Sequence, residues 1–271
     1  MNIHGILVVQ TLYNDRNDFV IKEEFIMEIQ NSDTIKNYNK ASIEKQDEYI
    51  VNALSEHYNL IKRDCSEFER FKVFNMDYSV KQYEVEGVGN LSIMDCKNSD
   101  SLQMISIVIT PFYKNLPLMS CDFMYTGEKR TFLMEIYELI EEKDDKFDSY
   151  MKEFQAIKDD YDALNDMKVK ECWYDDIRPV CTAKQILSDQ DKEMIEIFER
   201  NIQLYIKMEQ DMQKLPQEKL MGKWNATQLY TDKLIDVGGP ATNAVKTVMG
   251  AEKCRTFFNG VFFGVGLYKP E

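Results

Sequence analysis

The 271-residue sequence lacks the features of membrane, secreted and nucleic-acid-binding proteins. No apolar run approaches the roughly 20 residues that a membrane-spanning helix requires. The segment Met1–Gly5 has neither the basic start and apolar stretch of a signal peptide nor the Arg- and Ser-rich composition of a transit peptide. The net charge of −14 argues against nucleic acid and anionic membranes as partners, since both require a basic face. We therefore expect a cytoplasmic protein.

Motifs for bound nucleotides and for metals are missing as well. There is no Gly-x-Gly-x-x-Gly after a strand and no P-loop. The two histidines, His4 and His57, lie far from any acidic or cysteine cluster, so neither a zinc site nor a His-activated nucleophile is expected. The six cysteines form no Cys-x-x-Cys pair, which predicts free thiols rather than a disulfide framework.

The composition, 44% hydrophobic and 30% charged, is that of a globular protein. No internal repeat and no low-complexity linker appears, so we expect one domain over residues 1–271. Its parts would be a mainly helical segment 1–66, a sheet over 70–140, and helices with a docked tail over 141–271. In the first part, apolar residues at helical spacing predict a helix over 42–61 that Ser42 caps.

Three strands are predicted in the middle of the chain: 103–110 followed by Pro111, 118–125, and 131–137. The short Gly-containing loop 126–129 predicts an antiparallel hairpin between the last two. Both faces of these strands are largely apolar, with Met119, Cys121, Phe123 and Tyr125 on one side and Leu118, Asp122 and Met124 on the other. A sheet that is apolar on both sides needs helices above and below it.

Helices are predicted after the strands. Apolar stripes indicate helices over 141–167 and over 188–212, the latter capped by Ser188. A third is expected to begin after Gly239–Pro240 and to end near Met249–Gly250. The tail 257–268 is so apolar that we expect it to be docked in the core.

Asp122 is the one residue whose position suggests chemistry. It lies in the middle of a strand, where Asp is disfavoured, and it shares a face with apolar residues. A carboxyl in such surroundings has a raised pKa and can donate a proton near neutral pH. The alternative is an ordinary Asp near a strand end with a hydrogen-bond partner.

Short segments in a fixed order carry a resemblance to a known family. They are Ile107–Pro111, Leu116–Pro117, Cys121–Phe123, Phe132–Ile136, Trp173, Ile177–Pro179, Gly239–Ala241, Val248–Glu252, Phe257–Phe258 and Val261–Phe263. Over roughly residues 70–268 the sequence resembles the ferredoxin-dependent bilin reductases. The resemblance implies a three-layer α/β/α sandwich with a central antiparallel sheet.

The resemblance also implies an activity. Such an enzyme reduces a linear tetrapyrrole, biliverdin or a related bilin, by sequential single-electron transfers from reduced ferredoxin or flavodoxin. It binds no flavin, metal or nicotinamide, and Asp122 would donate protons. The positions that would contact the bilin are Ser106, Leu118, Ser120, Met124, Gly239 and Pro240.

Two positions depart from the family pattern. Gly239 stands where many members have a second acidic residue, and Ser106 stands where some have a histidine. A non-catalytic tetrapyrrole carrier, which binds the bilin without reducing it, is therefore the alternative. A third alternative is an acidic interaction module with no small ligand.

The charge is unevenly distributed along the chain. From Lys214 to the end, eight Lys and Arg stand against five Asp and Glu, a balance of +3 on an otherwise acidic protein. Because ferredoxins and flavodoxins are acidic, we expect their docking surface in this segment. The candidate residues are Lys223, Lys233, Lys246, Lys253 and Arg255. The alternative is an ordinary solvated helix face.

Overall fold

One antiparallel sheet of eight strands forms the middle layer, in the order β1-β3-β4-β5-β6-β7-β8 with β2 paired to β3. The computed structural model describes residues 23–169 and 171–271. The strands are β1 (Leu60–Arg63), β2 (Arg70–Val73), β3 (Met76–Val85), β4 (Gly89–Asp95), β5 (Gln103–Pro111), β6 (Leu118–Thr126), β7 (Lys129–Tyr137) and β8 (Val180–Leu187).

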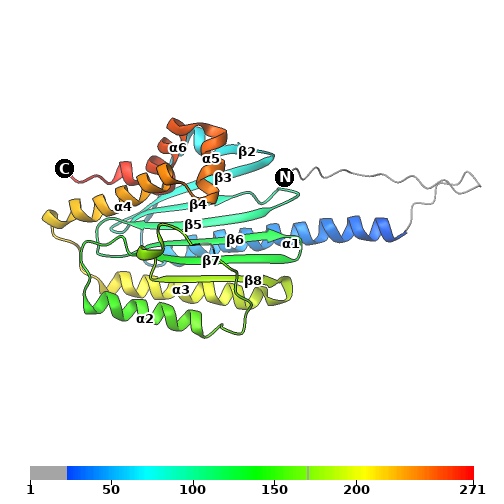
Figure 1. Cartoon of the computed structure of the whole chain (residues 1–271), viewed down its shortest axis with the longest axis horizontal. Coiled ribbons are helices and arrows are strands. Elements are labelled where there is room, and N and C mark those ends of the chain that lie inside the picture. Colours follow the sequence, from blue (N-terminus) through cyan, green and yellow to red (C-terminus); the bar gives the residue numbers. More distant parts are fainter. Residues whose placement is uncertain (1–22, 170) are drawn as a thin grey trace, which may run out of the picture.

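Helices cover both faces of the sheet. They are α1 (Glu23–Ser55), α2 (Asp145–Asp159), α3 (Asp191–Asp211), α4 (Gln217–Val237), α5 (Pro240–Met249) and α6 (Ala251–Phe257). Helices α1, α2 and α3 form one outer layer, and α4, α5 and α6 gather on the other side, over β2 to β4 (Figure 1). The predicted α/β/α sandwich with an antiparallel sheet is confirmed.

Alternate residues of β6 enter two different cores, as the sequence pattern predicted. Met119, Cys121 and Phe123 are buried against α1, α2 and α3. Leu118 is buried with the C-terminal helices on the opposite face. The apolar tail also enters this second core, where Phe257 and Phe258 are buried.

The β6–β7 hairpin turns at Gly127, where a side chain would be strained. Its φ of 58° lies in the left-handed region that Gly adopts readily. The turn pairs Thr126 with Lys129, and this fixes the register of the two strands. Strands β5, β6 and β7 lie within one residue or two of their predicted bounds.

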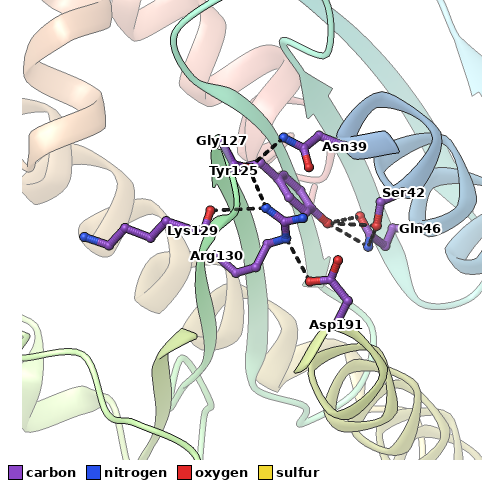
Figure 2. A network of polar contacts seen from close by, with 8 residues as sticks. All are labelled: Asn39, Ser42, Gln46, Tyr125, Gly127, Lys129, Arg130 and Asp191. Atoms are coloured by element: carbon purple, nitrogen blue, oxygen red, sulfur yellow. Dashed lines mark hydrogen bonds and ion pairs between the residues drawn. The ribbon is translucent and has the colours of Figure 1, made fainter. Parts of the chain in front are cut away.

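A buried polar network ties this hairpin to α1 and α3, as Figure 2 shows. Arg130 is 0% exposed, and its Nε donates to Asp191 Oδ1 over 2.8 Å while its Nη1 donates to the Gly127 carbonyl over 2.8 Å. On α1, Gln46 Nε2 donates to Tyr125 Oη over 2.9 Å. The guanidinium lies 4.9 Å from the Tyr125 ring centroid, in cation–π contact.

The predictions for helix starts were partly wrong. Ser42 does not cap a helix: it lies inside α1, which begins well before it, and its Oγ is 3.3 Å from Tyr125 Oη. The helix ends at Ser55, so strand β1 occupies the end of the segment predicted to be helical. Ser188 opens a short 3₁₀ turn without a side-chain cap. The cap of α2 is Asp144, whose carboxylate accepts from the Phe147 N–H over 2.7 Å.

Helix α4 and strand β8 are among the elements that were not predicted. Helix α4 escaped notice because its buried face contains Lys223, Thr227 and Thr231, which give no apolar stripe. Strand β8 contains Lys184, which is 1% exposed and whose Nζ lies 2.8 Å from Asp166 Oδ1. Over residues 23–169 and 171–271, no helix is long and apolar enough to cross a membrane.

Candidate active site

Strand register brings the candidate residues together on the face of the sheet opposite α1, α2 and α3. Ser106 on β5 pairs with Asp122 on β6, and Asp122 pairs with Leu133 on β7. Two pairs further along, Ser120 is paired with Glu135. Paired residues in an antiparallel sheet point to the same side, so these side chains share one surface.

This surface is partly open to solvent, in contrast to the opposite face. Partly exposed side chains lie on each of the strands β5, β6, β7 and β8. They are Met104, Ser120, Asp122, Met124, Thr131, Leu133, Cys181 and Gln185. Most carry apolar atoms, with a few hydroxyl, amide and carboxyl groups among them. Such a surface suits a flat, largely apolar ligand with polar edges.

The pKa of the Asp122 carboxyl is raised from its ordinary value into the neutral range. Burial of the carboxyl among protein atoms raises its pKa to about 7, and repulsion from Glu135 acts in the same direction. A hydrogen bond from Ser106 Oγ to Asp122 Oδ1 favours the carboxylate and partly opposes the shift. The raised pKa agrees with the expectation from its strand position, and the hydrogen-bond partner of the alternative interpretation is also present.

Glu135 is the second carboxyl of this face, and both of its oxygens accept hydrogen bonds. Arg178 Nη1 donates to Oε1, and Tyr137 Oη donates to Oε2 over 2.9 Å. Arg178 also forms an ion pair with Asp175 at 2.5 Å. These partners fix the orientation of a carboxylate that is only 8% exposed.

Aromatic side chains form a wall beside the two carboxyls. The Tyr137 ring centroid lies 5.1 Å from that of Tyr230 on α4 and 5.8 Å from that of Tyr174. Trp173 packs on Tyr230 at 5.7 Å. Burial raises the pKa of the Tyr137 and Tyr230 phenols, and the negative charge of Asp122 contributes to the shift of Tyr230. Both phenols therefore stay neutral: Tyr137 donates to Glu135, and Tyr230 is the phenol that interacts electrostatically with Asp122.

The structure places the predicted bilin-contacting residues at three locations. Ser106, Ser120 and Met124 neighbour Asp122 on the sheet, as expected. Leu118 lies on the same face but is 1% exposed, because the C-terminal layer packs over it, so it lines no open surface. Gly239 and Pro240 begin α5, whose contacts are with α4, α6 and β2 near the other edge of the sheet.

The predicted docking surface is wrong in part. Lys223 is 0% exposed, and its Nζ donates to the carbonyls of Leu116 and Leu139, so it cannot contact a partner. Lys246 is half-buried and donates to the Ile235 carbonyl over 3.0 Å.

The other three docking candidates reach the surface, but two of them form ion pairs within the protein. Lys253 pairs with Glu67, and Arg255 pairs with Asp232 and with Asp236 at 2.5 and 2.7 Å. Lys233 is exposed and lies 4.5 Å from the centroid of the Trp173 ring. Of the predicted cations, only Lys233 therefore adjoins the aromatic wall.

None of the six cysteines, all of which lie in the described part of the chain, forms a disulfide, as their spacing predicted. Among residues 23–169 and 171–271, no group of three or more His, Cys, Asp or Glu side chains could hold a metal ion. A surface cavity of about 490 Å³ lies elsewhere, between β1 and the C-terminal tail, with Arg63 and Gln82 in its lining. Asp122 is not in the lining of that cavity.

Comparison with solved structures identifies the architecture. No family model and no curated protein matches the sequence. Phytochromobilin synthase from tomato, solved in complex with biliverdin, superposes with a TM-score of 0.67, over 82% of this chain and 83% of that one, at 12% identity. The chain shares the fold of phytochromobilin synthase. The resemblance drawn from the sequence is thereby confirmed at the level of the fold.

Glu135 and Tyr230 were not anticipated from the sequence. The signal for Glu135 was present: a hairpin that pairs Thr126 with Lys129 also pairs Ser120 with Glu135, beside Asp122. Tyr230 lies on α4, far along the chain, and no local pattern connects it to the sheet. Arg178 was noted only as part of the family resemblance, without a role.

Proposed function

We propose that the protein is an oxidoreductase that reduces a linear tetrapyrrole, biliverdin or a related bilin. Electrons would arrive singly from reduced ferredoxin or flavodoxin, and Asp122 would donate protons. The observation that carries the proposal is a carboxyl with a pKa of about 7 on a partly open face, in the fold of a protein that was solved with biliverdin. A cytoplasmic location follows the expectation from the sequence.

The open face offers each part of this chemistry a residue. Met104, Met124 and Leu133 present apolar surface to the pyrrole rings, and Ser120 presents a hydroxyl to a polar edge. A bilin that gains an electron becomes more basic, and protonated Asp122 is poised to neutralise it. One reduction adds two electrons and two protons, so Asp122 is reprotonated from solvent if it supplies both.

A non-catalytic bilin carrier is the second candidate. Gly239 supports it, because many bilin reductases have a second acidic residue at this place and Gly carries no side chain to donate a proton. Both candidates require a bound bilin, whereas an interaction module does not.

The electron donor would dock beside the aromatic wall. Lys233 is an exposed cation that lies on the Trp173 ring, which in turn packs on Tyr230. An acidic donor that binds there would face an attractive charge next to the bilin face. We expect Lys233→Glu to weaken coupling to ferredoxin while bilin binding is kept. Lys253→Glu is the matched control, because Lys253 is already paired with Glu67.

Anaerobic mixing tests the proposal in two steps. Adding the protein to biliverdin should change the bilin absorption spectrum, and adding reduced ferredoxin should then convert the bound bilin to a reduced product. A changed spectrum without conversion would favour the carrier. An unchanged spectrum at micromolar protein would contradict both candidates.

A further inference from the structure

Asp122 and Glu135 are diagonal neighbours on the same face of β6 and β7. Asp122 pairs with Leu133, so Glu135 stands two residues along the partner strand. Diagonal positions in an antiparallel sheet are about 7–8 Å apart, within the range at which two carboxylates repel strongly in a partly buried setting.

Glu135 is suited to hold a charge and not to deliver a proton. Arg178 and Tyr137 occupy its two oxygens, and Cys181 Sγ lies 4.0 Å from Oε1. Glu135 is thus the anchored ion-pair partner of a guanidinium. Its position is fixed because both partners are themselves held in place: Arg178 by Asp175 and Tyr137 by the ring of Tyr230.

The groups that face Asp122 come from three elements. Ser106 on β5 donates a hydrogen bond to it, Glu135 on β7 places a negative charge beside it, and Tyr230 on α4 contributes a neutral phenol. Beyond β7, the strand β8 contributes Ala183 at the level of Leu133 and Cys181 at the level of Glu135. Arg178 is the cation of this cluster, and Glu135 and Asp175 share its charge.

We infer that Glu135 is a positioning residue whose anchored negative charge adds to the effect of burial in keeping Asp122 protonated, and that Arg178 sets how strongly it does so. This role rests on the proposed function only for the destination of the proton, which would be the bound bilin. The effect itself exists in the protein without any ligand.

The test is the titration of Asp122 in the ligand-free protein. Infrared difference spectra of ¹³C-aspartate-labelled protein, with Asp122→Asn to assign the band, report its protonation at each pH. Glu135→Gln removes the charge and leaves Arg178 paired with Asp175 alone, so the pKa of Asp122 should fall by up to about one unit. Arg178→Gln removes the counter-charge and should raise it. Opposite shifts are not expected from a general loosening of the site.

Two controls separate charge from packing. Glu138→Gln removes the same charge from a half-exposed position just beyond the end of the same strand, where Glu138 pairs with Lys143, and should leave the titration unchanged. Glu135→Asp keeps the charge and should restore the wild-type titration even if Glu135→Gln folds poorly. An Asp122 titration that is the same in wild type, Glu135→Gln and Arg178→Gln would overturn the inference.

Turnover measurements then show whether the charge matters to catalysis. If protonated Asp122 is required, activity falls as pH rises through its pKa. In Glu135→Gln this decline should occur at a pH that is up to about one unit lower than in wild type. A shifted titration without any bilin reduction would uphold the role of Glu135 and reject the proposed function. Bilin reduction with an unshifted titration would do the reverse.

Discussion

The acidic side chains on the two sides of the β6–β7 hairpin differ in their partners. Toward α1 and α3, the network of Figure 2 pairs Asp191 with Arg130, a guanidinium that is 0% exposed. Toward the open face, Asp122 has a hydroxyl partner and a like charge nearby, and no cation contacts it among the described residues. A paired carboxylate can fix a helix to a hairpin, whereas an unpaired one retains a proton near neutral pH.

The same hairpin therefore carries stabilising residues on one side and the candidate site residues on the other. Tyr125 and Arg130 point to the closed side, where their partners come from α1 and from the N-terminal end of α3. Asp122 and Glu135 point to the open side, where a ligand has access. Substitutions on the two sides should therefore change different quantities.

Replacing Asp122 should have the largest effect, and it should be on turnover. Asp122→Asn keeps the shape of the side chain and removes the proton, so we expect bilin reduction to slow by about 100-fold or more. Steady-state assays with biliverdin and reduced ferredoxin measure it, and the bilin absorption spectrum shows whether binding is kept. Asp77→Asn, at an exposed site, is the control. Turnover near the wild-type rate would mean that Asp122 is structural.

Replacing Asp191 should instead reduce stability. Asp191→Ala leaves the Arg130 charge buried without its partner, which should lower the free energy of unfolding by about 3–5 kcal/mol. Urea denaturation measures the loss, and the activity per folded molecule should stay close to wild type. A loss below about 1 kcal/mol would show that the network contributes little to the fold.

Lys223 extends the comparison to a buried cation. Burial lowers its pKa to about 7, from an unfolded value near 10.4. The unfolded chain therefore binds an extra proton between these values, so Lys223 destabilises the fold increasingly as pH falls from about 10 to 7. Lys223→Met abolishes this term. Wild type gains this stability as pH rises from 7 to 10 and the variant does not. The free energy of unfolding of Lys223→Met minus that of wild type should therefore fall by at least about 1 kcal/mol over this pH range. A pH-independent difference would contradict it.

The smallest effect is expected at Ser106. Ser106→Ala removes a hydrogen bond that favours the Asp122 carboxylate, so the pKa of Asp122 should rise by less than about one unit. The pH at which turnover declines should then move upward, in the direction opposite to Glu135→Gln. Complete pH–rate profiles of the two variants measure both shifts, and shifts of the same sign would contradict the account.

The sequence predicted those parts of the fold whose patterns are local. Alternation and the Gly127 turn located β5, β6 and β7, and the apolar stripe of α3 located that helix. Helix α4 and strand β8 were missed because buried Lys223 and Lys184 interrupt their patterns, and their carbonyl and carboxylate partners lie elsewhere in the chain.

The site was predictable to the same degree. Asp122 was identified because an acidic residue in an apolar strand is out of place. Glu135 required the hairpin register to be carried six pairs back from its turn toward Leu118, which the sequence allowed. The contacts of Arg178 and Tyr230 depend on a long loop and on α4 packing over the sheet, and no local pattern contains them.

A crystal structure of the biliverdin complex tests the central claim most directly. We expect the bilin to lie on the open face of β5 to β8, with one of its nitrogen or oxygen atoms within about 3.2 Å of an Asp122 carboxyl oxygen. A bilin bound on the side of α1, α2 and α3, or on the open face but out of reach of Asp122, would contradict the account.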